Sequence, residues 1–384
     1  MFEFTIIKKA SGSLARTGVL KTAHGTVHTP AFMPVATIGA VKTVSSWELV
    51  DCSIEMLIAN AYHLYLRPGD PYIREMGGLH RFMHWDRPIV TDSGGFQIYS
   101  LSPLRKITRD GVCFTSHIDG STHFLTPEAV VDIQFNLGSD IMMILDECVG
   151  HNASEKEAAR SVELTGLWAR RALRHYKQQK GHFSSPGALF GIIQGGMCLR
   201  LRTEAVKELL ELDFDGYAIG GLSVGESAKL RNDLTRHVTG LLPREKCVHL
   251  MGVGKPQDVL HAVDAGIDLF DCVLPTRNGR NGQAFTNEGP LNLRAAYYRD
   301  DVRPIEEGCT CHACCTMSRA YLRHLLKIEE VLGIRMLSLH NICFYARFFQ
   351  RIRHALSTDT FGAFCEDFFA RYKENEAQKG IVSS

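Results

Sequence analysis

The feature of this sequence that most constrains its fold is a pattern that occurs eight times between residues 31 and 271. Each time, a short apolar run ends in a polar or glycine-rich corner, and a stretch with helical character follows most of these corners. The runs do not alternate with polar residues, which is typical of strands buried on both faces of a parallel sheet. The eight runs are 31–35, 56–59, 88–91, 141–145, 189–193, 217–219, 248–250 and 267–270.

The segments between the runs carry signals of helix ends. Thr126 precedes Pro127 as an N-cap precedes proline at the first helical position, and Gly138 ends that segment. Pro256 opens another helix that Gly266 closes. Eight strand–helix units predict an α/β fold, a closed (β/α)8 TIM barrel, with an open doubly wound sheet as the alternative.

The positions of the polar residues favour the barrel. They lie at or just past the carboxyl ends of the strands, where barrel enzymes build their sites. They are Asn60, Asp92, Asp146, Gln194, Gly221, Met251 and Asp271.

Three segments depart from the pattern. Residues 1–30 alternate apolar and polar positions and predict an N-terminal antiparallel β segment, while Asp-Gly pairs within 105–125 predict hairpins over the barrel. The cysteine cluster predicts a zinc-binding insertion subdomain near the C-terminus. The expected organisation is 1–30 as the β segment packed on the barrel, 31–299 as the barrel body, 300–340 as the zinc-binding subdomain, and 341–384 as the last barrel helix, from about His340 to Leu356, with a tail.

Composition bounds the setting. A chain of 384 residues with 45% hydrophobic content is an ordinary globular protein, and its net charge of +1 does not decide for or against nucleic acid. The absence of a long apolar run and of a leader pattern predicts no membrane partner and a cytoplasmic location. Most of the twelve cysteines are scattered singly, which suits reduced thiols and one metal site.

The metal signal is the spacing Cys309-x-Cys311-x2-Cys314 with His340 downstream. Three thiolates and one imidazole complete tetrahedral Zn²⁺ and leave no open position, so the predicted zinc is structural. Cys315 is a competing candidate ligand.

The polar residues after the strands can have a functional or a purely structural role. Asp92 and Asp146 are candidate site carboxylates, but an aspartate after a strand can also be a helix N-cap or accept loop amides. Gln194 stands before two glycines, which suits close ligand approach or a tight turn. The loop Gly220–Glu226 offers backbone N–H groups to an anion or a carbonyl.

Together the motifs resemble one family, the tRNA-guanine transglycosylases of queuosine modification, and they occur in family order across nearly the whole chain. The motifs are Asp92-Ser93-Gly94-Gly95-Phe96-Gln97, Asp146-Glu147-Cys148, Gly191-Ile192-Ile193-Gln194-Gly195-Gly196, Gly220-Gly221-Leu222-Ser223-Val224-Gly225-Glu226, His249-Leu250-Met251-Gly252-Val253-Gly254, Phe270-Asp271-Cys272-Val273-Leu274-Pro275-Thr276-Arg277 and the zinc cluster with Ser318-Arg319-Ala320-Tyr321-Leu322-Arg323-His324-Leu325.

The resemblance implies a covalent mechanism. Asp271 would attack C1′ of the wobble ribose, expel guanine and form an RNA–enzyme intermediate, and Asp92 would be the general acid/base. The base-binding residues that the resemblance implies are Phe96, Asp146, Gln194, Gly221, Leu222 and Met251, with Val224 and Cys148 at the specificity positions.

The resemblance also implies partners. The anticodon loop of tRNA would contact Val273, Leu274, Arg277 and Arg280, and a homodimer with one structural zinc per subunit would form through Met317, Tyr321 and His324. A basic patch that could hold the tRNA backbone, or simply be a solvated helix face, consists of Arg319, Arg323, Lys327, Arg335, Arg347, Arg351 and Arg353.

Three alternatives stay open at this point. Val224, where eukaryotic members have glycine, favours the smaller base 7-aminomethyl-7-deazaguanine (preQ1), but the incoming base could be queuine. A non-catalytic tRNA-binding accessory subunit is disfavoured because Asp92 and Asp271 are both present. A zinc hydrolase on a barrel is disfavoured by the closed Cys3His set.

Overall fold

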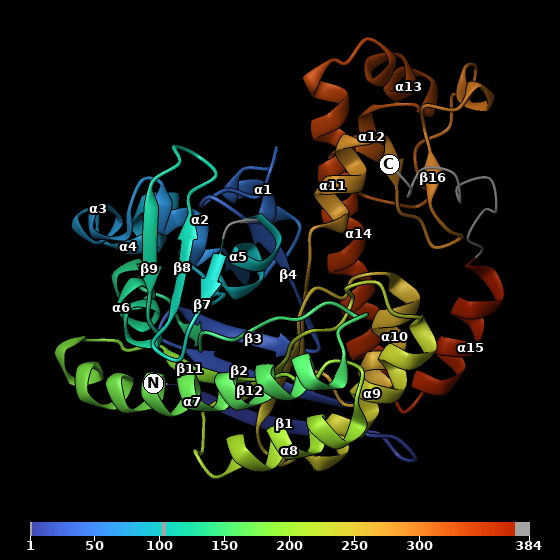
Figure 1. Cartoon of the computed structure of the whole chain (residues 1–384). Helices are drawn as coiled ribbons and strands as arrows, with labels where there is room; N and C mark the ends of the chain where they lie inside the picture. Colours follow the sequence, from blue (N-terminus) through green and yellow to red (C-terminus); the bar gives the residue numbers. More distant parts are fainter. Residues whose placement is uncertain (1, 102–104, 373–384) are drawn as a thin grey trace. The chain divides into compact units, whose positions relative to one another are not determined.

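The computed structural model describes residues 2–101 and 105–372 (Figure 1). The chain forms two compact units, each made of two segments. Met1–Gly39 and Glu55–Asp271 form the first unit, and Ala40–Ile54 and Cys272–Ser384 form the second.

The core of the first unit is a closed barrel of eight strands in the order β10-β11-β12-β13-β14-β4-β5-β6. The (β/α)8 barrel is therefore confirmed, and an open sheet is excluded because the strands close on themselves. The strands are β4 (Ala31–Ala36), β5 (Leu57–Ala59), β6 (Ile89–Thr91), β10 (Ile141–Met143), β11 (Ala188–Ile193), β12 (Gly216–Ile219), β13 (Cys247–Leu250) and β14 (Leu269–Cys272).

Burial explains why these short runs become strands. Every residue of β5, β6, β10, β11, β12 and β13 is buried, as expected for parallel strands covered on both faces. Neighbouring strands from β4 through β14 pair in parallel around the barrel, so their carboxyl ends lie together at one end. Asp92, Asp146 and Gln194 follow β6, β10 and β11 at that end, and Asp271 lies within β14.

The predicted helix signals are present. The Thr126 side chain accepts the Ala129 N–H at the start of α6, and Gly138 ends the helix in the left-handed conformation. No helix in the described part of the chain combines the length and apolar character that a membrane crossing requires. The helices of the first unit are α2 (Ala61–Leu66), α3 (Asp70–Glu75), α4 (Gly78–Met83), α5 (Gly95–Leu101), α6 (Pro127–Leu137), α7 (Glu155–Gln179), η1 (Lys180–His182), α8 (Leu199–Leu210), α9 (Ala228–Leu241) and α10 (Pro256–Asp264).

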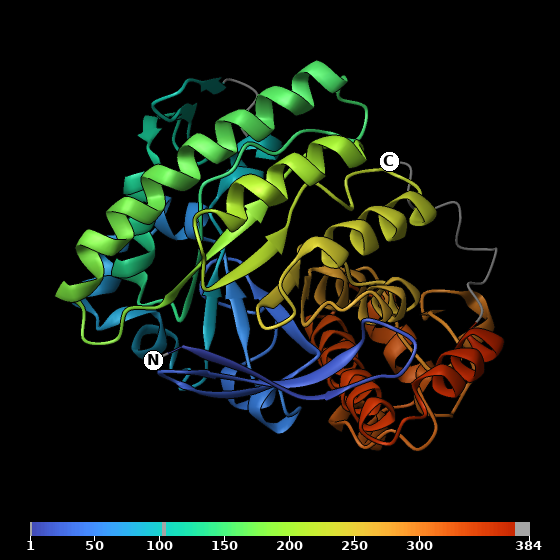
Figure 2. The same ribbon diagram turned by 90° about the horizontal axis from the view of Figure 1, so that it is seen from below.

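An antiparallel sheet of β1 (Glu3–Lys9), β2 (Arg16–Thr22) and β3 (Gly25–Thr29) lies at the amino ends of the barrel strands (Figure 2). The Arg16 guanidinium forms a buried ion pair with Asp268, just before β14, with Nε 2.9 Å from Oδ1. The Phe2 ring packs edge-on against Phe190 of β11 at 5.6 Å. The sheet therefore covers the end of the barrel opposite the polar corners.

The predicted hairpins are a second antiparallel sheet. It consists of β7 (Arg105–Ile107), β8 (Val112–Thr115) and β9 (Thr122–Leu125), with the two Asp-Gly pairs in the connections. The Trp168 indole N–H of α7 donates to the Arg109 carbonyl at 3.0 Å and joins this sheet to the barrel helices.

The second unit is mainly helical. Its long helix α14 begins at Val331 rather than near His340, so His340 lies inside the helix, and a further helix, α15, follows it. The predicted tail beyond residue 372 lies outside the described residues. The elements are α1 (Ser46–Asp51), α11 (Leu274–Arg280), β15 (Gln283–Ala284), β16 (Leu291–Asn292), η2 (Ala296–Tyr298), α12 (His312–Thr316), α13 (Arg319–Lys327), α14 (Val331–Ser357) and α15 (Phe361–Arg371).

The expectation that the scattered cysteines are all free thiols is wrong for one pair. Cys52, after α1, forms a disulfide with Cys343 of α14, across a sequence separation of 291 residues. The adjacent ion pair between Glu48 and Arg335, at 2.5 Å, joins the same two helices. Sequence spacing carries no signal for so distant a pair.

Candidate active site and metal centre

Asp271 is held at the carboxyl end of the barrel by two donors. The His249 Nε2–H lies 2.8 Å from Asp271 Oδ1, and the Gly252 N–H donates to the same oxygen at 3.0 Å. The Asp271 side chain retains 15% exposure. One oxygen is therefore fixed by the protein while the carboxylate still reaches the surface of the site.

Asp92 has a more enclosed environment. Its oxygens accept the Asn60 side-chain amide, the Ala61 N–H at 3.0 Å and the Gln97 amide at 2.8 Å. Burial raises the pKa of Asp92 to about 6, against the opposing effect of these donors, and the charge of Asp271 raises it further. The two carboxylates therefore interact electrostatically and belong to one site.

Asp146 and Gln194 form a buried polar edge beside this pair. Asp146 accepts the Ser93 hydroxyl at 2.9 Å and the Gln194 amide at 2.6 Å, and burial raises its pKa. The carbonyl oxygen of Gln194 has no partner among the described residues. A Cβ at Gly221, which has φ +64°, would lie 2.4 Å from that oxygen, so only glycine fits there.

Arg202 is a structural residue of the site that the sequence analysis missed. This fully buried arginine of α8 donates to the carbonyls of Gly196 at 3.0 Å, Gly220 at 3.1 Å and Gly221 at 3.4 Å. Burial lowers its pKa to about 10. One guanidinium thus fixes the loops after β11 and β12, and nothing in the local sequence of α8 distinguishes it from a surface arginine.

The loop after β12 is held from two sides. The Glu226 carboxylate accepts the N–H groups of Ser223 at 2.6 Å and Val224 at 2.9 Å. The His151 Nδ1–H donates to the Val224 carbonyl at 3.0 Å, and Leu222 is buried. Val224, the predicted specificity residue, therefore lies in a loop of defined shape.

The remaining predicted base-contacting residues are in the same unit. Phe96 is the second residue of α5 and is 50% exposed, and Met251 follows β13. Cys148 is buried, and burial raises the pKa of its thiol to about 12, so it is a neutral thiol. An exposed aromatic ring near hydrogen-bonded carboxylates suits a planar, polar ligand.

The predicted RNA-contacting residues lie in the second unit, at α11. Arg277 is exposed, and Val273 before the helix is 42% exposed. Burial, and then the Arg277 charge, lower the pKa of Arg280, and Arg280 Nη1 is buried without a partner among the described residues. A buried donor beside a second cation can be satisfied by an anion.

The predicted basic patch is not a set of free cations. Its guanidinium groups are largely engaged inside the second unit, because they bind carbonyls, carboxylates and a thiolate there. The contacts are Arg319 to Asp301 and Ile305, Arg323 to Ala295, Arg335 to Glu48, Arg347 to Glu306 and Cys309, and Arg351 to Asn287.

The predicted dimer residues lie on and before α13 of the second unit. Tyr321 is 44% exposed and His324 is exposed one turn further along. Met317 precedes α13 and is half-buried. They share the unit with other exposed apolar side chains, including Val302 and Val331.

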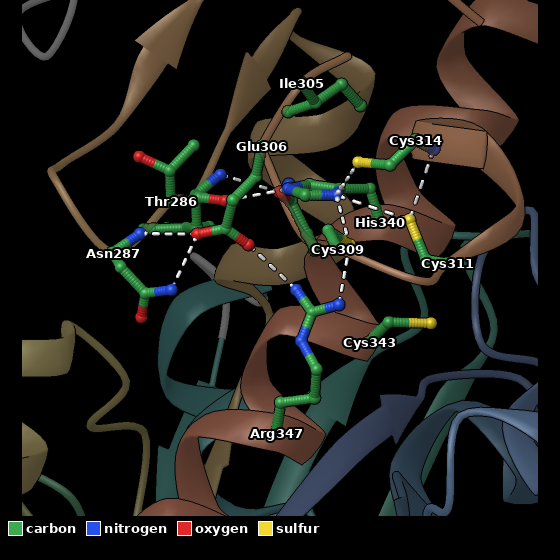
Figure 3. Close-up of polar contacts among 12 residues, drawn as sticks. Thr286, Asn287, Ile305, Glu306, Cys309, Cys311, Cys314, His340, Cys343 and Arg347 are labelled. Atoms are coloured by element: carbon green, nitrogen blue, oxygen red, sulfur yellow. Dashed lines mark hydrogen bonds and ion pairs between the residues drawn. The ribbon is translucent and has the colours of Figure 1, made fainter. Parts of the chain in front are cut away.

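Cys309, Cys311, Cys314 and His340 form a compact group (Figure 3). Their sulfur atoms lie 3.9, 3.5 and 3.3 Å from His340 Nδ1, close to the ~3.5 Å separation of neighbouring ligands in tetrahedral zinc. The His340 Nε2–H donates to the Phe285 carbonyl at 2.8 Å, which directs Nδ1 toward the thiols. The group therefore fits a structural metal of the zinc type.

A second layer of contacts supports this group. Arg347 Nη1 lies 2.6 Å from Cys309 Sγ, and Nη2 lies 2.9 Å from the Glu306 carboxylate (Figure 3). Thiol donors from Cys311 and Cys314 hold the pKa of Cys309 below its usual value. The Cys315 sulfur lies 3.9 Å from the Cys309 carbonyl and is exposed, outside the group.

The fold is a closed barrel with two interacting carboxylates at its carboxyl end, as in barrel enzymes, and the chain also carries a Cys3His group that could hold a metal ion. A family model described as queuine tRNA-ribosyltransferase matches residues 11–374. Similar proteins named queuine tRNA-ribosyltransferase occur in Thermodesulfovibrio yellowstonii, at 48% identity over 98% of this chain and 97% of the relative, and in Lawsonia intracellularis, at 52% over 90% and 92%. A third, from Solidesulfovibrio magneticus, is 50% identical over 94% and 96%.

The chain belongs to the queuine tRNA-ribosyltransferase family and is an enzyme of this family. The resemblance to tRNA-guanine transglycosylases that the motifs indicate is thereby confirmed.

Proposed function

We propose that this enzyme exchanges the wobble guanine of tRNAs with G-U-N anticodons for preQ1, in queuosine biosynthesis in the cytoplasm. The observation that carries the proposal is the pair Asp92 and Asp271. Both lie at the carboxyl end of the barrel, the charge of one raises the pKa of the other, and their surroundings differ. Two carboxylates in unlike surroundings suit two different roles.

Asp271 is the proposed nucleophile. Its Oδ2 attacks C1′ of the ribose, the glycosidic bond to guanine breaks, and a covalent aspartyl–ribose intermediate forms. Attack by the incoming base then breaks the Oδ2–C1′ bond and restores the sugar configuration, as in a retaining glycosidase. Asp92, with a pKa of about 6, protonates the departing guanine and later takes a proton from the incoming base.

Asp146 and Gln194 are the proposed readers of the guanine-like edge. The Asp146 carboxylate suits the ring N–H and amino group, and the amide of Gln194 with the Gly221 N–H suits the ring carbonyl oxygen. Phe96 and Met251 would cover the two faces of the base. A buried polar edge of this kind rejects a base with other donors and acceptors, because the buried groups would be left unpaired.

The incoming base is proposed to be preQ1 rather than queuine. Val224 carries a branched side chain in a loop fixed by Glu226 and His151, which supports a pocket for the smaller base. Leu222 would present its backbone to the aminomethyl group, and Cys148 would contribute a neutral wall. Queuine is the competing substrate.

The proposed RNA contacts are Val273, Leu274, Arg277 and Arg280 with the anticodon loop. The unpartnered Nη1 of Arg280 supports a phosphate contact. A homodimer is proposed through Met317, Tyr321 and His324, supported by the exposed apolar side chains of that unit. One Zn²⁺ per subunit at Cys309, Cys311, Cys314 and His340 would stabilise the second unit and take no part in the chemistry.

The test combines base exchange with adduct trapping. Labelled guanine in the wobble position should be released from tRNA when preQ1 is supplied, and much more slowly with queuine. Asp271→Asn and Asp271→Ala should abolish the denaturant-stable enzyme–RNA adduct while tRNA still binds. An adduct that persists in both variants would refute the assigned nucleophile, and equal exchange with queuine would refute the assigned base.

A further inference from the structure

His249 stands out among the buried side chains of the barrel because it contacts the carboxylate of Asp271 directly. It is 0% exposed on β13, and its Nε2 lies 2.8 Å from Asp271 Oδ1. The parallel register of β13 and β14 pairs His249 with Leu269, so Asp271 lies two residues further along the neighbouring strand. Two rigid strands therefore hold this contact.

The other ring nitrogen of His249 has different surroundings from Nε2. Nδ1 is buried and has no partner among the described residues. The contact that the ring makes at this site is therefore the Nε2–H that it donates to the carboxylate.

The two oxygens of Asp271 have different surroundings as a result. Oδ1 accepts from both His249 and the Gly252 N–H, whereas Oδ2 has no hydrogen bond to the described residues. The two donors therefore orient the carboxylate and leave Oδ2 open to a substrate.

We infer that His249 is a positioning residue for Asp271: it fixes Oδ1, directs Oδ2 toward the ribose, and stabilises the carboxylate when it leaves. This inference rests on the proposed nucleophilic role of Asp271. In the covalent intermediate Oδ2 carries the ribose and Oδ1 is the ester carbonyl, which still accepts the His249 N–H. When the incoming base displaces Oδ2, the bonding electrons return to the carboxylate, and the same hydrogen bond strengthens as charge returns.

The test compares a variant that keeps a donor with variants that do not. His249→Gln places an amide N–H where Nε2 stands, whereas His249→Phe fills the space without a donor, and His249→Met serves if the Phe variant does not fold. Single-turnover adduct formation and its discharge by preQ1 are measured with tRNA and base titrations, beside urea unfolding of each variant.

We expect the Phe and Met variants to slow both steps about 10- to 100-fold, the equivalent of one hydrogen bond to a charged group, with the KM for tRNA unchanged. The Gln variant should recover most of the rate. Unfolding midpoints should fall only modestly, because Asp271 Oδ1 keeps the Gly252 N–H and the lost Nδ1 had no partner among the described residues.

Two outcomes would overturn the inference: a Phe or Met variant with wild-type rates, or rate losses in Gln, Phe and Met that simply follow the loss of stability. Failure of the proposed function itself looks different, because Asp271→Ala would then still form the adduct. If Asp271→Ala abolishes the adduct and the donor-free variants react normally, the role of His249 alone is refuted.

Discussion

Asp92 and Asp271 carry the same functional group in surroundings that give them different properties. Asp92 is buried, with three amide donors around it and a pKa raised to about 6, whereas Asp271 keeps one oxygen free of protein donors in the described part of the chain. A carboxyl group that exchanges its proton near neutral pH suits acid/base work. A fixed, charged carboxylate suits attack on carbon.

The two half-reactions should therefore depend on pH in opposite directions. In the proposed mechanism adduct formation requires protonated Asp92, so its single-turnover rate should fall above pH 6, by about tenfold per pH unit at the limit. The proposed discharge of the adduct by preQ1 requires the Asp92 carboxylate, so its rate should rise through the same range. Asp92→Asn should flatten both profiles, and two profiles that move in parallel would exclude Asp92 as the shared acid/base.

At the level of elements, one carboxylate joins the N-terminal sheet to the barrel. Asp140, just before β10, lies 2.9 Å from His24 Nδ1 in the β2–β3 turn and 3.1 Å from His80 Nε2 in α4, and it accepts the Ile89 N–H. The two imidazole rings stack at 3.5 Å with 17° between their planes. The lone pair of an imidazole nitrogen lies in the plane of its ring, so two stacked rings cannot both point a lone pair at one metal ion. We therefore interpret the contacts of His24 and His80 with Asp140 as structural.

This pairing should make stability depend on pH. Asp140 raises the pKa of His24 above its ordinary 6.5, and the charge of Asp86 raises it slightly further. The contribution of protonated His24 to the free energy of unfolding is therefore complete below pH 6.5 and is lost as the pH rises through the raised pKa. The histidines lower the pKa of Asp140 below 3.8, so its contribution is present above that pH and is lost on further acidification. Both contributions to stability are therefore complete between pH 3.8 and pH 6.5.

We predict that His24→Gln costs about 0.5 kcal/mol near pH 5.5, after discount for solvent screening, and less at pH 8.5. Urea unfolding at the two pH values measures the difference. His182→Gln, at an exposed position of η1, is the matched control and should be neutral at both. An equal cost of His24→Gln at pH 5.5 and 8.5 would show that the pairing has no ionic component.

The elements themselves could be predicted because each depends on local signals. The strand Ala188–Ile193 is continuous apolar sequence, and the helix Pro127–Leu137 has its N-cap and its terminal glycine within the segment. The polar corners Asp92 and Asp146 followed from the rule that parallel strands place their carboxyl ends together. The candidate site could therefore be assembled without distances.

What could not be predicted are contacts between residues far apart in the chain. Arg202 looks like any arginine of an amphipathic helix, yet it is fully buried and binds loop carbonyls. The pairs His249–Asp271 and Cys52–Cys343 depend on strand register and helix packing that no local pattern encodes. The start of α14 at Val331 was missed because its first turns lack a clear N-cap side-chain bond.

For the whole molecule, the metal group should support the second unit and not the chemistry. A strong zinc chelator, or Cys314→Ser, should lower bound zinc from about one per chain toward zero and make the second unit sensitive to proteases, because three thiolates and an imidazole would lose their shared ligand. Metal analysis and limited proteolysis measure both effects.

Cys315→Ser is the matched control, since its sulfur is exposed and lies outside the Cys3His group. It should retain its zinc and its protease resistance. A chelated enzyme that keeps its fold and loses only base exchange would contradict a structural role and would favour a catalytic metal.

The second unit contains residues 40–54, which are separated from the rest of it by most of the barrel sequence. On the ribosome, Glu48 and Cys52 emerge long before Arg335 and Cys343, the partners they bind within that unit. At about 5–20 residues per second, a separation of 291 residues means a delay of roughly 15–60 s. The chain must therefore be synthesised past Cys343 before this unit can form, and a fragment that starts at Cys272 would lack part of it.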